Sequence, residues 1–179
     1  IVHHNHSPAA AGETQQEILR MGREAWVIQA DLEDTAQAAR LMDSAARIAP
    51  LNGLVNNAAI FGPGDALSTS LDTWQQHLAV NLTAPFLLSQ AFARNLKDGS
   101  EGCILNILDW RALRPGADHF AYTISKAALA ALTQSLAVAL APRIQVNGLA
   151  FGAILPPADG GPTDGTLASV PAGRWADLK

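Results

Sequence analysis

The chain has 179 residues, of which 49% are hydrophobic and 16% are charged. This composition is that of a globular protein and excludes an intrinsically disordered one, and the length suits one domain with a well-buried core. The formal net charge is −4 and the Lys and Arg residues are scattered, which excludes an extended basic face for nucleic acid. Every apolar run is broken well before the roughly 18 residues that a membrane-spanning helix needs, so we expect none.

Strand and helix patterns alternate along the chain. We expect strands at 1–4, 25–30, 51–58, 103–108 and 144–149, and helices at 9–21, 33–49, 71–80, 83–96 and 119–141. This βαβ spacing predicts a single α/β domain over 1–179, a Rossmann-like doubly wound parallel sheet in three α/β/α layers. The tail 152–179 is rich in Gly, Pro, Ala and Asp and predicts a mobile flap over the substrate rather than a second domain.

Cys103 is the only cysteine. An internal disulfide is therefore impossible, and a reducing, cytoplasmic setting fits. Because Cys103 lies in the apolar run 103–108, we expect a buried structural thiol. The sequence begins at Ile1, in what reads as the middle of a strand, with no signal peptide visible, so we expect that Ile1 is not the biological N-terminus.

Tyr122 and Lys126 stand four residues apart in the predicted helix 119–141. Residues at this spacing share one helix face, so the phenol and the ammonium can reach the same cavity. A neighbouring cation favours the phenolate, which brings a side chain with an ordinary pKa of about 10 closer to a useful general acid or base. A surface Lys beside a partly buried Tyr fits this short motif as well.

Other polar residues lie where predicted strands and helices end. Asn57 and Ala58 close the strand 51–58, and in open α/β sheets such carboxyl ends face the ligand crevice, where small residues let a cofactor approach the backbone. Asn81 lies at a predicted helix break, where its amide can hold a water or a backbone group. Asp109 ends the next apolar strand, thirteen positions before the Tyr.

In their order and spacing these residues resemble the motifs of the short-chain dehydrogenase/reductase family. The matching segments are Asn56-Asn57-Ala58-Ala59, Asn81, Tyr122-x-x-x-Lys126-Ala127-Ala128-Leu129 and Val146-Asn147-Gly148-Leu149-Ala150. The resemblance implies an NAD(P)-dependent oxidoreductase that acts on a small molecule.

The resemblance also implies a role for each matched residue. Tyr122 delivers a proton to the substrate, Lys126 lowers the pKa of the Tyr and binds the nicotinamide ribose, and Asn81 holds a water relay behind the Lys. Asn57 stabilises the central strand beside the cofactor. The remaining implied cofactor contacts are Ala58, Gly152, Ile154, and Asp31 with Leu32 beside the adenine. Asp31 fits an ordinary strand-end residue equally well.

Asp109 departs from the family pattern, which usually has Ser thirteen residues before the Tyr. A Ser hydroxyl donates to a carbonyl, whereas an ionised carboxylate only accepts and suits a substrate with N–H groups or a proton relay to a ring nitrogen. Asp at this position resembles the pteridine reductases and dihydromonapterin reductases, which implies a pterin-like or cyclic imine substrate stacked on Phe61. A core-plugging role fits Phe61 equally well.

The run 3–7 favours NADP(H) over NAD(H). It resembles the polar, acid-free second strand of those reductases, and NAD-preferring folds place an acid there to accept from the ribose. His3 and Ser7 can contact a phosphate instead. His4 and His6 share one strand face, but no Cys or carboxylate joins them nearby, so we expect no metal site.

The Gly-rich turn that cradles the pyrophosphate in this family does not occur in the sequence. We therefore expect that roughly 30 residues, a strand and its helix, are missing at the front, and that a further helix and strand are missing at the end. The missing first strand is central in the family's sheet, so both its neighbours should expose unpaired edges.

Two alternatives stay open. One is a general ketone or alcohol oxidoreductase with Asp109 in place of Ser. The other is a catalytically silent scaffold, in which Asp109 marks the loss of catalysis. The joint presence of Tyr122, Lys126 and Asn81 favours an enzyme. The helix 119–141 packs between subunits in this family, so we expect a homodimer or homotetramer, with no nucleic acid or membrane partner.

Overall fold

The computed structural model describes residues 1–152, 154, 167, 170 and 172–176. Strands and helices alternate in the order β1 (Val2–His4), α1 (Pro8–Arg20), β2 (Val27–Gln29), α2 (Thr35–Ile48), β3 (Gly53–Asn56), α3 (Leu71–Leu78), a π-helical turn (Ala79–Thr83), α4 (Ala84–Asn95), β4 (Gly102–Asp109), a short 3-10 helix (Trp110–Ala112), α5 (Phe120–Leu140) and β5 (Ile144–Phe151). The order confirms the predicted α/β fold. Most of the flap predicted at 152–179 lies outside the described residues.

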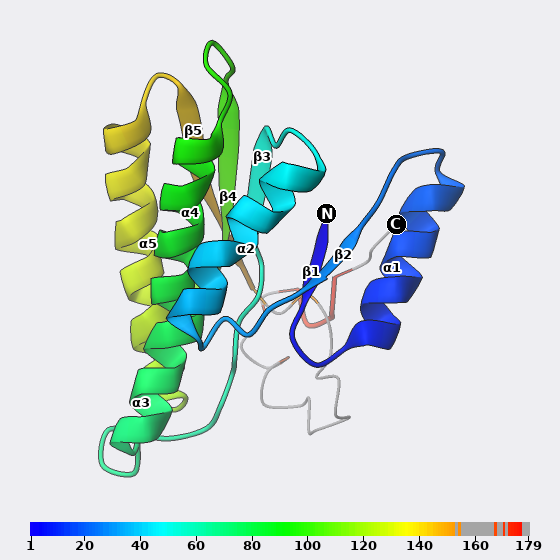
Figure 1. Ribbon diagram of the computed structural model, residues 1–179. Coiled ribbons are helices and arrows are strands. Elements are labelled where there is room, and N and C mark those ends of the chain that lie inside the picture. The colour runs from blue at the N-terminus through cyan, green and yellow to red at the C-terminus, as the bar shows by residue number, and fades with distance from the viewer. Residues whose placement is uncertain (153, 155–166, 168–169, 171, 177–179) are drawn as a thin grey trace.

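All strand pairs are parallel, and they form two sheets. β1 pairs with β2, with Val2 opposite Val27, and β3, β4 and β5 pair in that order. Figure 1 shows β1, β2 and α1 on one side and β3–β5 with α2, α4 and α5 on the other. No described strand lies between β1 and β3, and residues of both, such as His3 and Leu54, line one cavity of 360 Å³. These unpaired edges are those expected from the sequence.

Helices α4 and α5 cover one face of the sheet β3–β5 (Figure 1). On the opposite face Val55 is 59% exposed and Leu149 is 42% exposed. Cys103 is also exposed, so the prediction of a buried thiol is wrong. Most residues of the strand that carries it are apolar, but the described residues cover only one of its faces.

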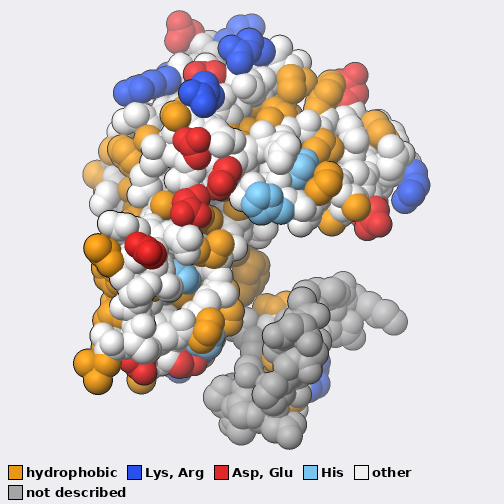
Figure 2. Space-filling model, turned by 60° about the horizontal axis from the view of Figure 1, so that its bottom comes forward, with side chains coloured by type: hydrophobic (Ala, Val, Ile, Leu, Met, Phe, Trp, Pro, Cys, Tyr) orange, Lys and Arg blue, Asp and Glu red, His pale blue; other side chains and the backbone are white. Residues whose placement is uncertain are grey.

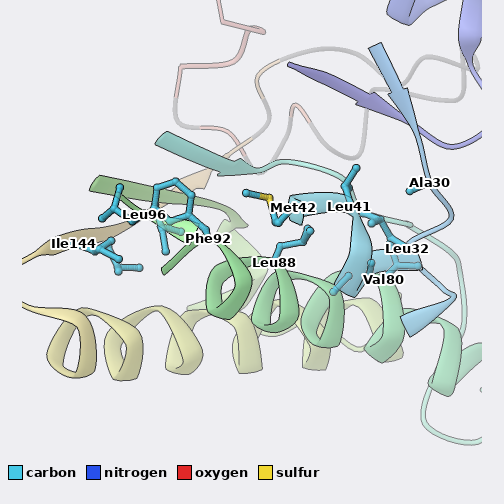
Figure 3. Packing of buried hydrophobic residues seen from close by; sticks show 13 residues of the cluster. Ala30, Leu32, Leu41, Met42, Val80, Leu88, Phe92, Leu96 and Ile144 are labelled. Atoms are coloured by element: carbon cyan, nitrogen blue, oxygen red, sulfur yellow. The ribbon is translucent and has the colours of Figure 1, made fainter. Parts of the chain in front are cut away.

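The core lies between this sheet and the helices α2 and α4. Phe92 and Leu88 of α4 meet Met42 of α2, and Ile104 of β4 is buried among them. Figure 3 shows the labelled side chains of this cluster in one layer that runs from Ile144 to Leu32 along the inner face of the helices. The amphipathic pattern of α2, with Ala38, Leu41, Met42 and Ala45 inward, is what places this helix here.

Helices α3 and α4 are joined by the π-helical turn Ala79–Thr83. The sequence predicted two helices with a break at Asn81, whereas the backbone stays helical and widens there by one residue. Such a turn reorients the side chains that follow, and π-turns are common at functional sites. Asn81 is fully buried as a result.

A ladder of buried polar side chains ties the sheet to α5. The Asn56 Nδ2 donates to Asn106 Oδ1 (2.8 Å), and the Asn106 Nδ2 donates to Thr133 Oγ1 (2.8 Å). Asn106 is completely buried. Because a buried polar group without its partner pays its full desolvation cost, this ladder favours a single register of β3, β4 and α5.

Replacing Asn106 with Ala is expected to lower the free energy of unfolding by about 2–3 kcal/mol, because it leaves the Asn56 amide and the Thr133 hydroxyl without this partner. Urea unfolding of the purified native protein measures the change. Asn52→Ala serves as the control, since Asn52 is exposed and its one bond, to the Glu101 carbonyl, is 3.3 Å long. Equal stability of the two variants contradicts this account of the ladder.

Helix α5 has 21 residues and contains an 18-residue window with a mean hydropathy of 1.4, enough by length and composition to cross a membrane. The expectation of no membrane-spanning helix is not overturned by this, since Lys126 still interrupts the apolar run. Length and composition are weak evidence, because the core helix of a globular protein meets them too. α5 packs along β4 and β5 and buries polar residues such as Thr123, Ser125 and Lys126, which identifies it as a core helix.

Candidate active site

Tyr122 and Asp109 meet at the carboxyl end of β4. The Tyr122 hydroxyl donates to Asp109 Oδ2 at 3.0 Å. The other carboxylate oxygen, Oδ1, accepts from the backbone N–H of Arg111 at 2.8 Å, which fixes the orientation of the carboxylate. Tyr122 is buried, so its hydroxyl is held toward Asp109 in a largely desolvated setting.

The pKa of Tyr122 is raised well above its ordinary value. Burial is the largest cause, and the charge of Asp109 and its hydrogen bond add to it, whereas the Arg111 cation opposes them. The expected lowering of this pKa by Lys126 stays a prediction. Tyr122 stays protonated at neutral pH, which suits a proton donor.

Lys126 lies under Tyr122 at the end of the sheet. Its Nζ donates to the carbonyl of Ile107 at 2.7 Å and lies 5.8 Å from the centre of the Tyr122 ring. Burial lowers the pKa of Lys126, and the Asp109 carboxylate raises it in part. The two side chains thus share one face of α5, as the spacing predicted.

Asn81 clamps the loop after β3 to α5. Its Oδ1 accepts from the backbone N–H of Ile60 (2.9 Å), and its Nδ2 donates to the Ile60 carbonyl and to Ser125 Oγ (both 3.0 Å). The side chain therefore holds backbone and hydroxyl groups beside Lys126. Its place in a water relay stays a prediction.

Phe61 lies in the loop that Asn81 holds. Its ring stacks on His119 at 4.0 Å and meets Tyr122 edge-on at 4.7 Å. Phe61 is 61% exposed, so it does not plug the core. The core-plugging alternative is therefore wrong, and stacking of a substrate on this ring stays a prediction.

Three residues of this site were missed in the sequence. Arg111 forms a two-pronged ion pair with Asp118, at 2.7 and 3.0 Å, and Asp118 also bonds His119 Nδ1 at 2.9 Å. The Arg111 guanidinium holds the pKa of the Asp118 carboxyl well below its usual range. The sequence signal for the pairing of Arg111 with Asp118 is their opposite charge at the two ends of the loop 111–119. A loop has no regular repeat, so their spacing in the sequence does not predict that they meet.

A second hollow lies at the carboxyl end of β1. This cavity of 210 Å³ is lined by His3, Asp31, Leu32 and Ala58, together with His4, Asn5, Glu33, Ala59, Ile60 and Val80. The structure thus brings together four of the residues expected to contact the cofactor. The His3 Nε2 is bonded to the Ala30 carbonyl at 2.8 Å, while the buried Nδ1 of His4 has no hydrogen-bond partner among the described residues.

The other expected cofactor residues lie elsewhere. Ser7 precedes α1 and makes no capping hydrogen bond. Asn57 is exposed and lines the cavity between β1 and β3, and its role beside the central strand stays a prediction, while Asn56 bridges β3 and β4. Gly152 follows β5, with no described atom within 4 Å of the position that a Cβ would take, and the Ile154 carbonyl accepts from the backbone N–H of Ala176.

Figure 2, which turns the lower side of Figure 1 forward, shows apolar, acidic and His side chains intermixed, with most of the Lys and Arg side chains in view at one edge. Among the described residues no three His, Cys, Asp or Glu side chains stand close enough to hold a metal ion.

A parallel α/β fold with polar side chains gathered at the carboxyl ends of its strands is the setting in which dinucleotide-binding proteins hold their ligand. The sequence profile described as short chain dehydrogenase matches residues 1–162. The chain belongs to this family of NAD(P)-dependent oxidoreductases.

Three proteins illustrate what the chain is similar to. It is 34% identical over 155 residues to inactive 2-(S)-hydroxypropyl-CoM dehydrogenase 2 of Xanthobacter autotrophicus, which covers 86% of this chain and 62% of that protein. It is 33% identical to 2-dehydro-3-deoxy-D-gluconate 5-dehydrogenase of Dickeya dadantii, over 91% of this chain and 68% of that one. The crystal structure of FolM alternative dihydrofolate reductase 1 from Brucella canis, complexed with NADP, matches with a TM-score of 0.84 and 36% identity, over 97% of this chain and 69% of that one.

The chain spans about three fifths of the length of several curated relatives that it matches, with 60–63% of their length covered. Family membership rests on residues 1–162, while the activity of the whole protein is a matter for proposal.

Proposed function

We propose that this protein is an NADPH-dependent reductase that delivers hydride to a pterin-like or other cyclic imine, with Tyr122 as the proton donor. The hydrogen bond of 3.0 Å between Tyr122 and Asp109 carries the proposal, because it puts a carboxylate where the family usually has a Ser hydroxyl. Similarity to the Brucella canis FolM protein supports the same substrate class.

The side chains divide the work as follows. Reduced nicotinamide, when bound, supplies the hydride to the ring carbon of the C=N bond. Tyr122 gives its hydroxyl proton to the ring nitrogen, so that its O–H bond breaks as the N–H bond forms. The nearby Lys126 ammonium stabilises the tyrosinate that results. The Asp109 carboxylate accepts hydrogen bonds from N–H groups of the substrate, and these bonds are stronger than those that a Ser hydroxyl would accept at this position.

The residues present fit the nucleotide. His3, Asp31, Leu32 and Ala58 line the cavity that suits the adenine end, and the unpartnered Nδ1 of His4 offers a polar contact there. The run 3–7 has no acid to repel a phosphate, so NADP(H) is the proposed cofactor, and Ser7 is its further proposed contact. Asn57, Gly152 and Ile154 are the residues proposed to border the nicotinamide half.

Consumption of NADPH by the purified native protein, followed at the nicotinamide absorbance, tests this function. Dihydrobiopterin is offered beside diacetyl and phenanthrenequinone, and each is repeated with NADH. We expect dihydrobiopterin to be the best substrate, with NADPH preferred over NADH by about tenfold or more, the effect of one well-placed phosphate contact. Turnover of the ketones alone rejects the pterin assignment.

A second candidate is a general ketone or alcohol oxidoreductase, favoured by the similarity to 2-dehydro-3-deoxy-D-gluconate 5-dehydrogenase. The silent scaffold also has a counterpart, since one relative is named inactive. For any of these we propose a homodimer or homotetramer formed through α5, on whose surface Ile124 and Val138 are 36% and 83% exposed. Absence of turnover with every substrate favours the scaffold.

A further inference from the structure

Phe61 and His119 stack ring on ring beside the catalytic hydroxyl. Their centroids are 4.0 Å apart and their planes differ by 13°. The Phe61 ring also meets Tyr122 edge-on at 4.7 Å and is still 61% exposed. His119 therefore covers one side of this aromatic ring and leaves the rest of it open next to the reacting group.

The backbone of His119 has an unusual conformation. Its φ of 51° and ψ of 47° lie in the left-handed region, which residues other than Gly seldom adopt. Such strain persists only where the surroundings impose it, and it gathers at functional sites. Here it turns the imidazole at the start of α5 onto the ring of Phe61.

The side chain of His119 is held from its other edge as well. Since the Asp118 carboxylate is ionised and only accepts, His119 Nδ1 is the donor in their bond of 2.9 Å. Asp118 is fixed by Arg111 through two bonds. Gly116 closes the loop over this pair so tightly that a Cβ there would come within 2.8 Å of both partners.

We propose that His119 is a specificity-determining residue, which holds Phe61 as a fixed wall for flat heteroaromatic substrates beside Tyr122. The inference rests on the proposed reductase function, since it needs a substrate at Tyr122. Phe61 lies in a loop without regular structure, and a ring held in place before binding spares the substrate the cost of ordering it. A stacked wall favours flat rings over small aliphatic carbonyls.

Two variants separate the stack from the hydrogen bond. His119→Asn removes the ring but keeps a donor for Asp118 and tolerates the left-handed backbone. His119→Phe keeps a ring for the stack and removes the donor. Leu67→Ala is the control, a 99% exposed side chain in the same loop as Phe61. Values of kcat and KM are measured for dihydrobiopterin, phenanthrenequinone and diacetyl, with thermal unfolding of each variant alongside.

We expect His119→Asn to raise KM for the two flat substrates about three- to tenfold, the usual worth of one aromatic stack, with kcat unchanged within about twofold. KM for diacetyl should stay the same, and His119→Phe should restore KM for the flat substrates. An equal change in KM for all three substrates, or a fall in kcat alone, overturns the proposal. A residue with a merely structural role would affect flat ring substrates and the aliphatic diacetyl alike.

Failure of the proposed function looks different. A native protein that reduces phenanthrenequinone but not dihydrobiopterin rejects the pterin assignment, while the comparison of phenanthrenequinone with diacetyl still decides the role of His119. If the native protein reduces dihydrobiopterin and His119→Asn leaves its kcat and KM unchanged, the proposed function is supported and the role of His119 is rejected.

Discussion

Tyr122→Phe is expected to lower kcat for dihydrobiopterin by about 10²–10⁴-fold, the usual contribution of a positioned general acid. The substitution removes one hydroxyl, the group that donates to Asp109, and keeps the ring that meets Phe61. KM should change little, because the wall contacts remain. Steady-state kinetics with NADPH measure both constants.

The control is the hydroxyl next to it on the same helix. Thr123 is buried, and its Oγ1 has no hydrogen-bond partner in the part of the chain that the structure describes, so Thr123→Val removes a buried hydroxyl that takes no part in the proposed chemistry. We expect kcat within about twofold of the native value for this variant. If Tyr122→Phe and Thr123→Val behave alike, Tyr122 is not the proton donor.

Asp109→Ser is expected to reverse the substrate preference. It restores a hydroxyl that donates to a carbonyl and removes the carboxylate that accepts substrate N–H groups. The value of kcat/KM for dihydrobiopterin should fall about a hundredfold, the cost of losing one or two charge-assisted hydrogen bonds, while that for diacetyl rises. A parallel loss for both substrates contradicts a role of Asp109 in specificity.

Asp109→Asn tests the electrostatics of the pair through the pH dependence. The charge of Asp109 helps to raise the pKa of Tyr122, so removing it lowers that pKa. Reduction needs the protonated Tyr, and the alkaline limb of kcat should therefore move to lower pH than in the native protein. Asp98→Asn is the matched control, because Asp98 is exposed and lies outside the site. An unmoved limb argues against coupling between Asp109 and Tyr122.

Much of the fold can be predicted from patterns that involve only residues close together in the sequence. Helix α2 matches its prediction because Asp34 caps it, accepting from Ala36 and Gln37, and because its apolar residues recur on one face. Cys103 shows where such patterns end. An apolar strand is the same in sequence whether one or both of its faces are covered, and only the tertiary arrangement decides.

The candidate site divides along the same line. Tyr122 and Lys126 could be paired from sequence because four residues make one helix turn. The stack of Phe61 on His119 joins two loops with no common period, and the left-handed backbone that produces it leaves no signature in a His residue. The direction in which the pKa of Tyr122 shifts could not be predicted from the sequence, because it depends on how deeply the side chain is buried. Burial raises this pKa by more than the Arg111 cation lowers it.

The proposed hydride transfer is measured by following deuterium from NADPH labelled at C4 of the nicotinamide into dihydrobiopterin. We expect the native protein to form a reduced pterin that carries deuterium on a ring carbon, seen by mass spectrometry, and Tyr122→Phe to form almost none. A reduced pterin without deuterium, or labelled product from diacetyl and none from the pterin, would contradict the proposed reaction.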